Sequence, residues 1–377
     1  MLLDTERKRE IAFGAGVLGL VILFAVAGET FLRLREGFRV DWNEMRQSVM
    51  AVDEETGLTR FVPGTGFGNI QVNHLGFTSP EVVVPKPDDT IRLVFLGDSV
   101  VLSASLAQDS RLASRVSAAV RAALPACNVD YVTIAGPSYR LSDITTLLGE
   151  SAAQIEPDGV VLVTGGISDI FLAMEEGGGP VTGLNAPPGW LERNSRLFSV
   201  AHQVYMKAAI ARRNVSDTGY GPIDPNDFSQ TYLKMIDTLG ARIGTGTGTG
   251  TGTGIGTGMG VVPVVVVENR GRERADSDRS KLARTDRVLL SHLEGMSVAG
   301  LRQLEDLQKR TLRKAAALHD WVYIDPLADV PPTRVYFRDQ MHLTATGVAE
   351  ITPVVASHLV DQLRAAKPAP GCLVETD

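Results

Sequence analysis

Cysteine is scarce in this chain of 377 residues, in which Cys127 and Cys372 are the only two. Two isolated cysteines supply neither the paired spacing of a zinc site nor the framework of a small disulfide-rich domain. Cys127 precedes a strand pattern and is expected to be a small buried residue, whereas Cys372 lies in a polar tail. A bridge between them would require an oxidising compartment, and we expect the two cysteines to be unbridged.

Basic residues are not in excess, because 37 Lys and Arg face 44 Asp and Glu, for a net charge of −7. This balance argues against nucleic acid as a partner, since non-specific binding to phosphates needs a basic surface.

The chain also lacks a His-Glu-x-x-His motif and any cluster of Cys or His. We therefore expect no metal and no cofactor. Oligomeric state is not indicated by the sequence.

Long apolar runs are absent, with one exception near the N-terminus. Ile11–Gly28 is eighteen residues without a charge or a polar stripe, which just reaches the length of a membrane-spanning helix. The sequence predicts a cytoplasmic tail at 1–10, a membrane anchor at 11–28, and the rest of the chain outside the cytoplasm. A cleaved signal peptide, for which Ala25-Val26-Ala27 would suit the peptidase, is the less favoured alternative because the apolar run is long.

Strand and helix patterns alternate from residue 90 onward. Short aliphatic runs, typical of parallel strands covered on both faces, occur at Ile91–Leu96, Val129–Ile134, Gly159–Thr164, Val261–Val267 and Trp321–Ile324. Helical patterns occur at Leu112–Leu124, Leu141–Ala153, Leu301–Leu318 and after Thr344, whose hydroxyl could cap the last helix. This alternation predicts an α/β fold, with a doubly wound parallel sheet between two layers of helices.

Several segments lie outside this alternation. Residues 29–89 form a connecting region, and the main domain is predicted at 90–366 with a short tail at 367–377. An insertion at 170–225 is interpreted either as a lid or pocket wall, or as a packed excursion. The Gly-Thr repeat at 244–260 is expected to be a flexible loop. Residues 268–287 are charge-rich and are expected to form a solvated loop.

Chemically active side chains occur in four separate blocks. They are Gly97-Asp98-Ser99, Gly136 within Ala135–Ser138, Gly166-Ile167-Ser168-Asp169, and Asp339-Gln340-Met341-His342. The first three follow predicted strands, and ligands of doubly wound sheets bind beyond the carboxyl ends of the strands. A serine hydroxyl needs a base to accept its proton and a third group to orient that base. Ser99, His342 and Asp339 are the candidates for these roles.

These blocks resemble the SGNH/GDSL hydrolase family over roughly residues 90–365. The resemblance implies a flavodoxin-like three-layer α/β/α fold, a Ser99–His342–Asp339 triad, and an oxyanion hole from Ser99, Gly136 and position 168. The third block departs from the family pattern, because Ser168 stands where an asparagine is usual, and a serine reaches less far than a carboxamide. Asp98, Gly166 and Asp169 are expected to support the site. Asn73–Glu81 is similar to a segment often found just before the domain in bacterial members.

The leading hypothesis is therefore a membrane-anchored, extracytoplasmic serine esterase that acts on a small ester or an acylated glycan. The alternative is an O-acyltransferase acting on an envelope or exported polysaccharide, with a sugar hydroxyl in place of water. A third hypothesis is a catalytically silent glycan-binding or assembly protein on the same fold, which the altered third block favours.

Overall fold

The structure of the chain is a computed structural model. It describes residues 2–36, 47–164, 169–170, 195, 197–198, 200–201, 204–205, 219–220, 223–244, 262–268, 296–331, 333–338, 341–366 and 371–373.

A five-stranded parallel sheet lies at the centre, with the strand order β6-β5-β7-β8-β9. Its strands are β5 (Thr90–Gly97), β6 (Asn128–Ala135), β7 (Gly159–Thr164), β8 (Val264–Glu268) and β9 (Val322–Ile324). Every residue of β5, β7 and β8 is buried, as continuous aliphatic runs predict for strands covered on both faces. The five predicted strands are therefore confirmed, although the fourth begins later than expected.

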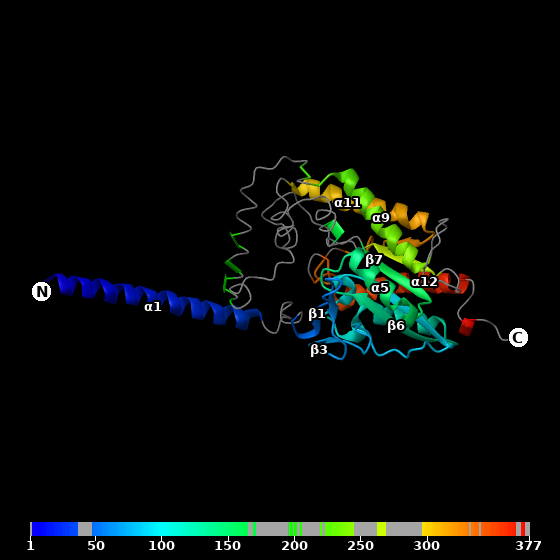
Figure 1. Cartoon of the computed structure of the whole chain (residues 1–377), viewed down its shortest axis with the longest axis horizontal. Helices are drawn as coiled ribbons and strands as arrows, with labels where there is room; N and C mark the ends of the chain where they lie inside the picture. The colour runs from blue at the N-terminus through cyan, green and yellow to red at the C-terminus, as the bar shows by residue number, and fades with distance from the viewer. Residues whose placement is uncertain are drawn as a thin grey trace.

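Two layers of helices cover the sheet (Figure 1). The helices are α4 (Leu112–Ala123), α5 (Leu141–Ile155), α9 (Pro225–Ile243), α11 (Val298–Leu318) and α12 (Ala345–Ala365). Helix α4 packs on α12, while α5 packs on α9 and α9 on α11. The chain runs from β5 outward to β6 and then returns to β7 on the other side of β5. Right-handed crossovers then place α4 and α5 on opposite faces, so the predicted doubly wound α/β/α fold is confirmed.

The strand order has a consequence for function. The strand order reverses at β5, because β6 is added on one side of it and β7 on the other, which makes the carboxyl ends of the parallel strands β5 and β7 the switch point of the sheet. Doubly wound sheets bind ligands in the crevice at such a point.

Helix termini follow the local sequence. Thr344 caps α12 by accepting a hydrogen bond from the amide of Gly347 at 3.1 Å, as predicted. Helix α9 was not predicted, although its signals are present. Asp224 accepts from the amides at N2 and N3, Pro225 occupies N1, and Gly244 ends the helix at φ +85°.

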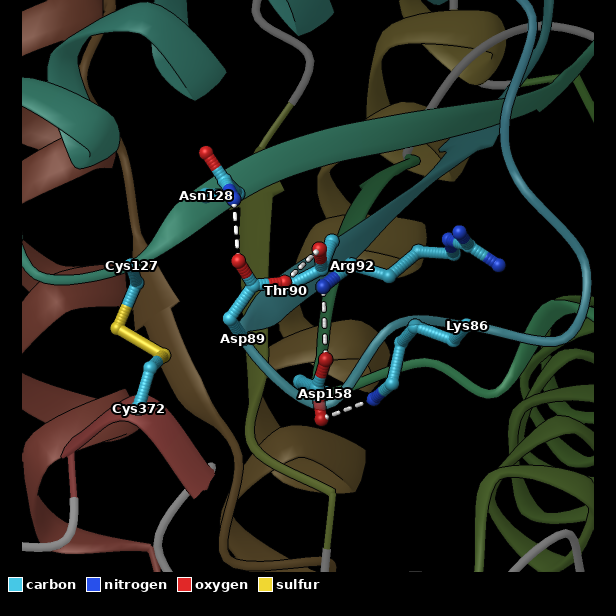
Figure 2. The surroundings of a disulfide bond; sticks show 8 residues. All are labelled: Lys86, Asp89, Thr90, Arg92, Cys127, Asn128, Asp158 and Cys372. Atoms are coloured by element: carbon cyan, nitrogen blue, oxygen red, sulfur yellow. Dashed lines mark hydrogen bonds and ion pairs between the residues drawn. A yellow bond between two sulfur atoms is a disulfide. The ribbon is translucent and has the colours of Figure 1, made fainter.

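The expectation of two unbridged cysteines is wrong. Cys127, just before β6, forms a disulfide with Cys372 in the short 3-10 helix η3 (Gly371–Leu373) (Figure 2). The two residues are separated by 245 positions, so only the fold brings them together. The bridge holds part of the predicted C-terminal tail against the edge strand of the sheet.

Residues 47–89, which we name the strap, are fastened to the domain by buried side chains. The strap contains the hairpin β1 (Met50–Val52) and β2 (Thr59–Phe61), and the hairpin β3 (Gly66–Phe67) and β4 (Ile70–Gln71). The guanidinium of Arg92, fully buried on β5, donates to the carbonyl of Val83 at 2.8 Å. Arg111, at the start of α4, donates to the carbonyls of Asn69 and Thr78.

Further contacts fix the end of the strap where it enters β5 (Figure 2). The ammonium of Lys86 lies 2.6 Å from the carboxylate of Asp158, which also accepts from the amide of Arg92 at 2.7 Å. Asp89 accepts from the side-chain amide of Asn128 at 2.7 Å. Asn73 is buried and accepts from the amides of Leu75 and Phe77, so the segment around Gly76 is a packed loop.

The N-terminal helix α1 (Leu2–Glu36) contains a stretch, Ala12–Leu32, with a mean hydropathy of 2.1. This stretch is long and apolar enough to cross a bilayer, and none of it is buried. Near its end, Glu29 accepts from the amide of Leu197 at 2.8 Å and from the hydroxyl of Ser195 at 3.1 Å. Most of the predicted insertion at 170–225 and of the Gly-Thr repeat at 244–260 lies outside the described residues.

Candidate active site

Ser99 lies where β5 ends, as the first residue of the four-residue helix α3 (Ser99–Leu102). Gly97 permits this sharp turn, because a Cβ there would lie 2.4 Å from a methyl of Val101 and 2.9 Å from the carbonyl of Val163. Asp98 caps α3 by accepting from the amide of Val100 at 2.9 Å. A helix this short has little dipole, and Asp98 already engages the Val100 amide.

His342 reaches Ser99 from the far end of the chain. Its Nε2 lies 2.9 Å from the Ser99 Oγ, across 243 residues of sequence. Both residues are half-buried. The loop that carries the histidine is held in place, because the His342 carbonyl accepts from the amide of Arg338 at 2.8 Å and Phe337 pairs with Leu343 in a β-bridge.

This contact is what nucleophilic catalysis requires. A neutral imidazole nitrogen at hydrogen-bond distance can accept the hydroxyl proton as the oxygen attacks an electrophile. The expected third member, Asp339, lies outside the described residues. Among the described residues, no group of three or more His, Cys, Asp or Glu side chains could hold a metal ion.

Gly136 follows β6, the neighbour of β5, and its turn is packed under Tyr139. A Cβ at Gly136 would lie 2.5–2.8 Å from three atoms of the Tyr139 ring, so only glycine fits. The amide of Tyr139 donates to the Gly136 carbonyl at 3.3 Å, and Ser138 between them has a left-handed φ of +60°. The other expected components, Gly166 and Ser168, lie outside the described residues.

Asp169 lies close to this turn and is buried, with 5% of its surface exposed. It accepts from the amide of Leu141 at 2.9 Å and from the hydroxyl of Thr164 at 3.2 Å. These bonds connect the end of β7 to the start of α5, which follows the Gly136 turn. Burial raises the pKa of Asp169 to about 7, and the negative charge of Asp98 adds to the effect.

Three features near the carboxyl edge of the sheet were not predicted from the sequence. Tyr139 supports the Gly136 turn, and Thr164 also contacts the hydroxyl of Tyr232 at 3.1 Å. Glu268 is fully buried at the end of β8, although we expected residues 268–287 to be solvated. The sequence does carry a signal for Glu268, because a carboxylate that directly ends a buried aliphatic strand is expected to be buried with it. No pattern links Tyr139 to a glycine or to its partners.

Comparison with known proteins gives likeness in structure alone. No family model matches the chain, and no curated protein matches it. Similar solved structures include a lipase/acylhydrolase from Enterococcus faecalis, 14% identical, with a TM-score of 0.39, covering 74% of this chain and 98% of that chain. Another, described as a GDSL-like lipase from Parabacteroides merdae, is 12% identical with a TM-score of 0.40, covering 74% and 100%.

An acetylxylan esterase from Geobacillus stearothermophilus is also similar, at 12% identity and a TM-score of 0.37, covering 71% of this chain and 94% of that chain. These proteins are named as lipases and esterases, the class that the four sequence blocks resemble.

Proposed function

We propose that the protein is a serine esterase of SGNH type. The observation that carries this proposal is the 2.9 Å contact between Ser99 Oγ and His342 Nε2 at the switch point of the sheet. A serine and a histidine from opposite ends of the domain meet where such folds bind ligands. Fold alone would not support the proposal, because one fold serves many functions.

In the proposed reaction, Ser99 Oγ attacks the ester carbonyl carbon while His342 accepts the hydroxyl proton. The tetrahedral intermediate collapses, the bond to the alcohol oxygen breaks, and His342 returns the proton to the leaving alcohol. Water then attacks the acyl-enzyme with His342 as the base, which releases the acid and restores Ser99. The resemblance assigns to Asp339 the role of orienting the imidazole.

The proposed oxyanion hole consists of the amides of Ser99 and Gly136, with Ser168 as a third donor. Loss of one donor from such a site costs about 2.7–4 kcal/mol of transition-state stabilisation. Serine in place of asparagine at position 168 therefore predicts either a slower enzyme or a donor supplied by water.

We further propose that α1 anchors the protein in a membrane and that the domain faces an extracytoplasmic compartment. The Cys127–Cys372 disulfide supports this location, because such bonds are rare in the cytosol and persist in oxidising compartments. Protease treatment of intact cells tests the topology, since a domain outside the cytoplasmic membrane is cleaved once the outer layers are permeable. A domain protected until the cytoplasmic membrane is lysed would contradict the location.

Hydrolysis of p-nitrophenyl acetate by the full chain in detergent tests the enzyme proposal. We expect Ser99→Ala to lower kcat/KM by about 10⁴-fold or to background, as loss of a serine nucleophile does. Ser357→Ala is the matched control, because Ser357 is exposed in the second half of α12, fifteen residues after His342. Equal rates for the wild type and Ser99→Ala would refute the esterase.

The same assay separates the alternative activities. An O-acyltransferase would release acid slowly until an oligosaccharide acceptor is added, and would then yield acylated sugar. A silent glycan-binding protein would show no turnover dependent on Ser99, and Ser99→Ala would bind the oligosaccharide as well as the wild type does.

A further inference from the structure

We infer that Tyr139 is a positioning residue through which the strap holds the Gly136 turn in its catalytic geometry. The inference rests on the proposed function, because it assigns Gly136 to the oxyanion hole. It adds a role for a segment that lies between the membrane helix and the domain.

The ring of Tyr139 packs closely against Gly136, on the side where a side chain at residue 136 would lie. The ring fills the position that a side chain at residue 136 would occupy, 2.5–2.8 Å from an ideal Cβ. Ring and glycine also belong to one tight turn, which is closed by the bond from the Tyr139 amide to the Gly136 carbonyl. A displacement of the ring would therefore leave a gap under the turn and allow the Gly136 amide to move.

The ring is held at its other end by the strap. The hydroxyl of Tyr139 donates to the carbonyl of Thr59, on β2, at 2.7 Å. A hydroxyl that binds a backbone carbonyl fixes the ring along its long axis, and Tyr139 is itself buried, with 7% of its surface exposed. The Thr59 carbonyl of the strap is thus the fixed point that holds the ring in place.

The fixed point is secured by ion pairs of the next residue, Arg60. Its guanidinium donates to the carboxylate of Glu150, on α5, at 2.9 Å, and lies 3.0 Å from that of Asp53, just after β1. Helix α5 begins two residues after Tyr139. The strap therefore contacts both the side chain that supports the turn and the helix into which the turn leads.

This arrangement predicts an effect on turnover that is separate from substrate binding. An oxyanion donor is needed where charge develops in the transition state, so a loosened Gly136 amide lowers kcat and leaves KM nearly unchanged. A hydroxyl that served only the stability of the strap would change the melting temperature and leave both kinetic constants as they are.

The experiment measures kcat, KM and melting temperature for the full chain and for Tyr139→Phe, with p-nitrophenyl acetate as substrate. We expect kcat to fall about 5–50-fold and KM to stay within about twofold, because small displacements of positioned groups are costly in catalysis. Tyr323→Phe is the matched control, since its hydroxyl accepts from Arg313 at 3.1 Å on the edge strand β9. The control is expected to keep the wild-type kcat.

A second variant tests whether the strap transmits the effect. Arg60→Met removes the ion pairs of β2 and is expected to lower kcat in the same direction. If both act through one contact, the double variant loses no more activity than the worse single variant. Wild-type kcat in Tyr139→Phe, in an enzyme that Ser99→Ala inactivates, would overturn the inference and leave the esterase intact. Equal rates for wild type and Ser99→Ala would overturn both.

Discussion

Two buried carboxylates at the carboxyl edge of the sheet are stabilised in different ways. Glu268, fully buried at the end of β8, has two cations near it, with Lys309 Nζ at 3.4 Å and Arg313 Nη2 at 2.9 Å. Asp169, after the neighbouring strand β7, has hydrogen bonds from Leu141 and Thr164.

Asp169, which has neutral hydrogen-bond donors beside it, has a raised pKa. Burial raises its pKa from the ordinary value of 3.8 to about 7, and the hydrogen bonds offset this rise only in part. Neutral donors therefore do not replace a cation as compensation for a buried charge. One strand end holds a carboxylate beside two cations, and the other holds a carboxyl group that takes up a proton near neutral pH.

The largest effect on stability should follow from removing the two cations beside Glu268, so that its surroundings resemble those of Asp169. In Lys309→Met/Arg313→Met, Glu268 stays buried without these cations, and we expect a loss of about 3–5 kcal/mol in the free energy of unfolding at pH 8. Urea unfolding of the wild type and the double variant at pH 8 measures this.

A third substitution tests the cause of that loss. Adding Glu268→Gln removes the stranded charge and should recover most of the stability at pH 8, because replacing a whole buried ion cluster is often nearly neutral. No recovery would mean that the cations act through packing of their aliphatic chains.

The next effect concerns Asp169 and has the opposite sign. Its folded pKa lies above its unfolded value, so the folded state binds more protons between about pH 4 and 7 and stability falls as pH rises through that window. Asp169→Asn keeps the acceptor for Leu141 and removes the charge. We expect it to raise the free energy of unfolding by roughly 1–3 kcal/mol at pH 8 and to flatten the pH dependence.

The matched comparison for Asp169→Asn is Asp158→Asn, because Asp158 is paired with Lys86 and should not gain stability when neutralised. A pH dependence between 4 and 7 that is unchanged in Asp169→Asn would show that another group causes it. Chemical unfolding at half-unit pH steps is sufficient.

The smallest effect is expected from Arg313→Met alone. The side chain of Arg313 is half exposed, whereas that of Lys309 is 21% exposed and remains beside Glu268. Exposed partners of ion pairs contribute little, so the loss should be at most about 1 kcal/mol. A loss as large as that of the double variant would mean that Arg313, also over the ring of Tyr323, is the main partner of Glu268.

The sequence predicted those parts of the fold that depend on local patterns. Aliphatic runs located the five strands, and Thr344 was identified as a helix cap because a hydroxyl before a helix has a local role. The meeting of Ser99 with His342 could be expected from the resemblance, because both blocks have fixed places in one topology.

Contacts that depend on the assembled fold could not be predicted. Cys127 and Cys372 are distant in sequence, and neither has a neighbouring pattern that names its partner. The bond from Tyr139 to the carbonyl of Thr59 leaves no trace in residue 59, because every residue has a carbonyl. Glu268 looked like the start of a charged loop, since its cations are 41 and 45 residues away on α11.

The way the strap is fastened has a consequence for how this protein can change during evolution. Arg92, Arg111 and Tyr139 all bind main-chain carbonyls of the strap, at Val83, at Asn69 and Thr78, and at Thr59. Mutations at these acceptor positions leave the acceptors in place, whereas mutations of the three donors remove the bonds. The strap can therefore diverge in sequence, and lineages that keep the three donors should keep its path across the domain.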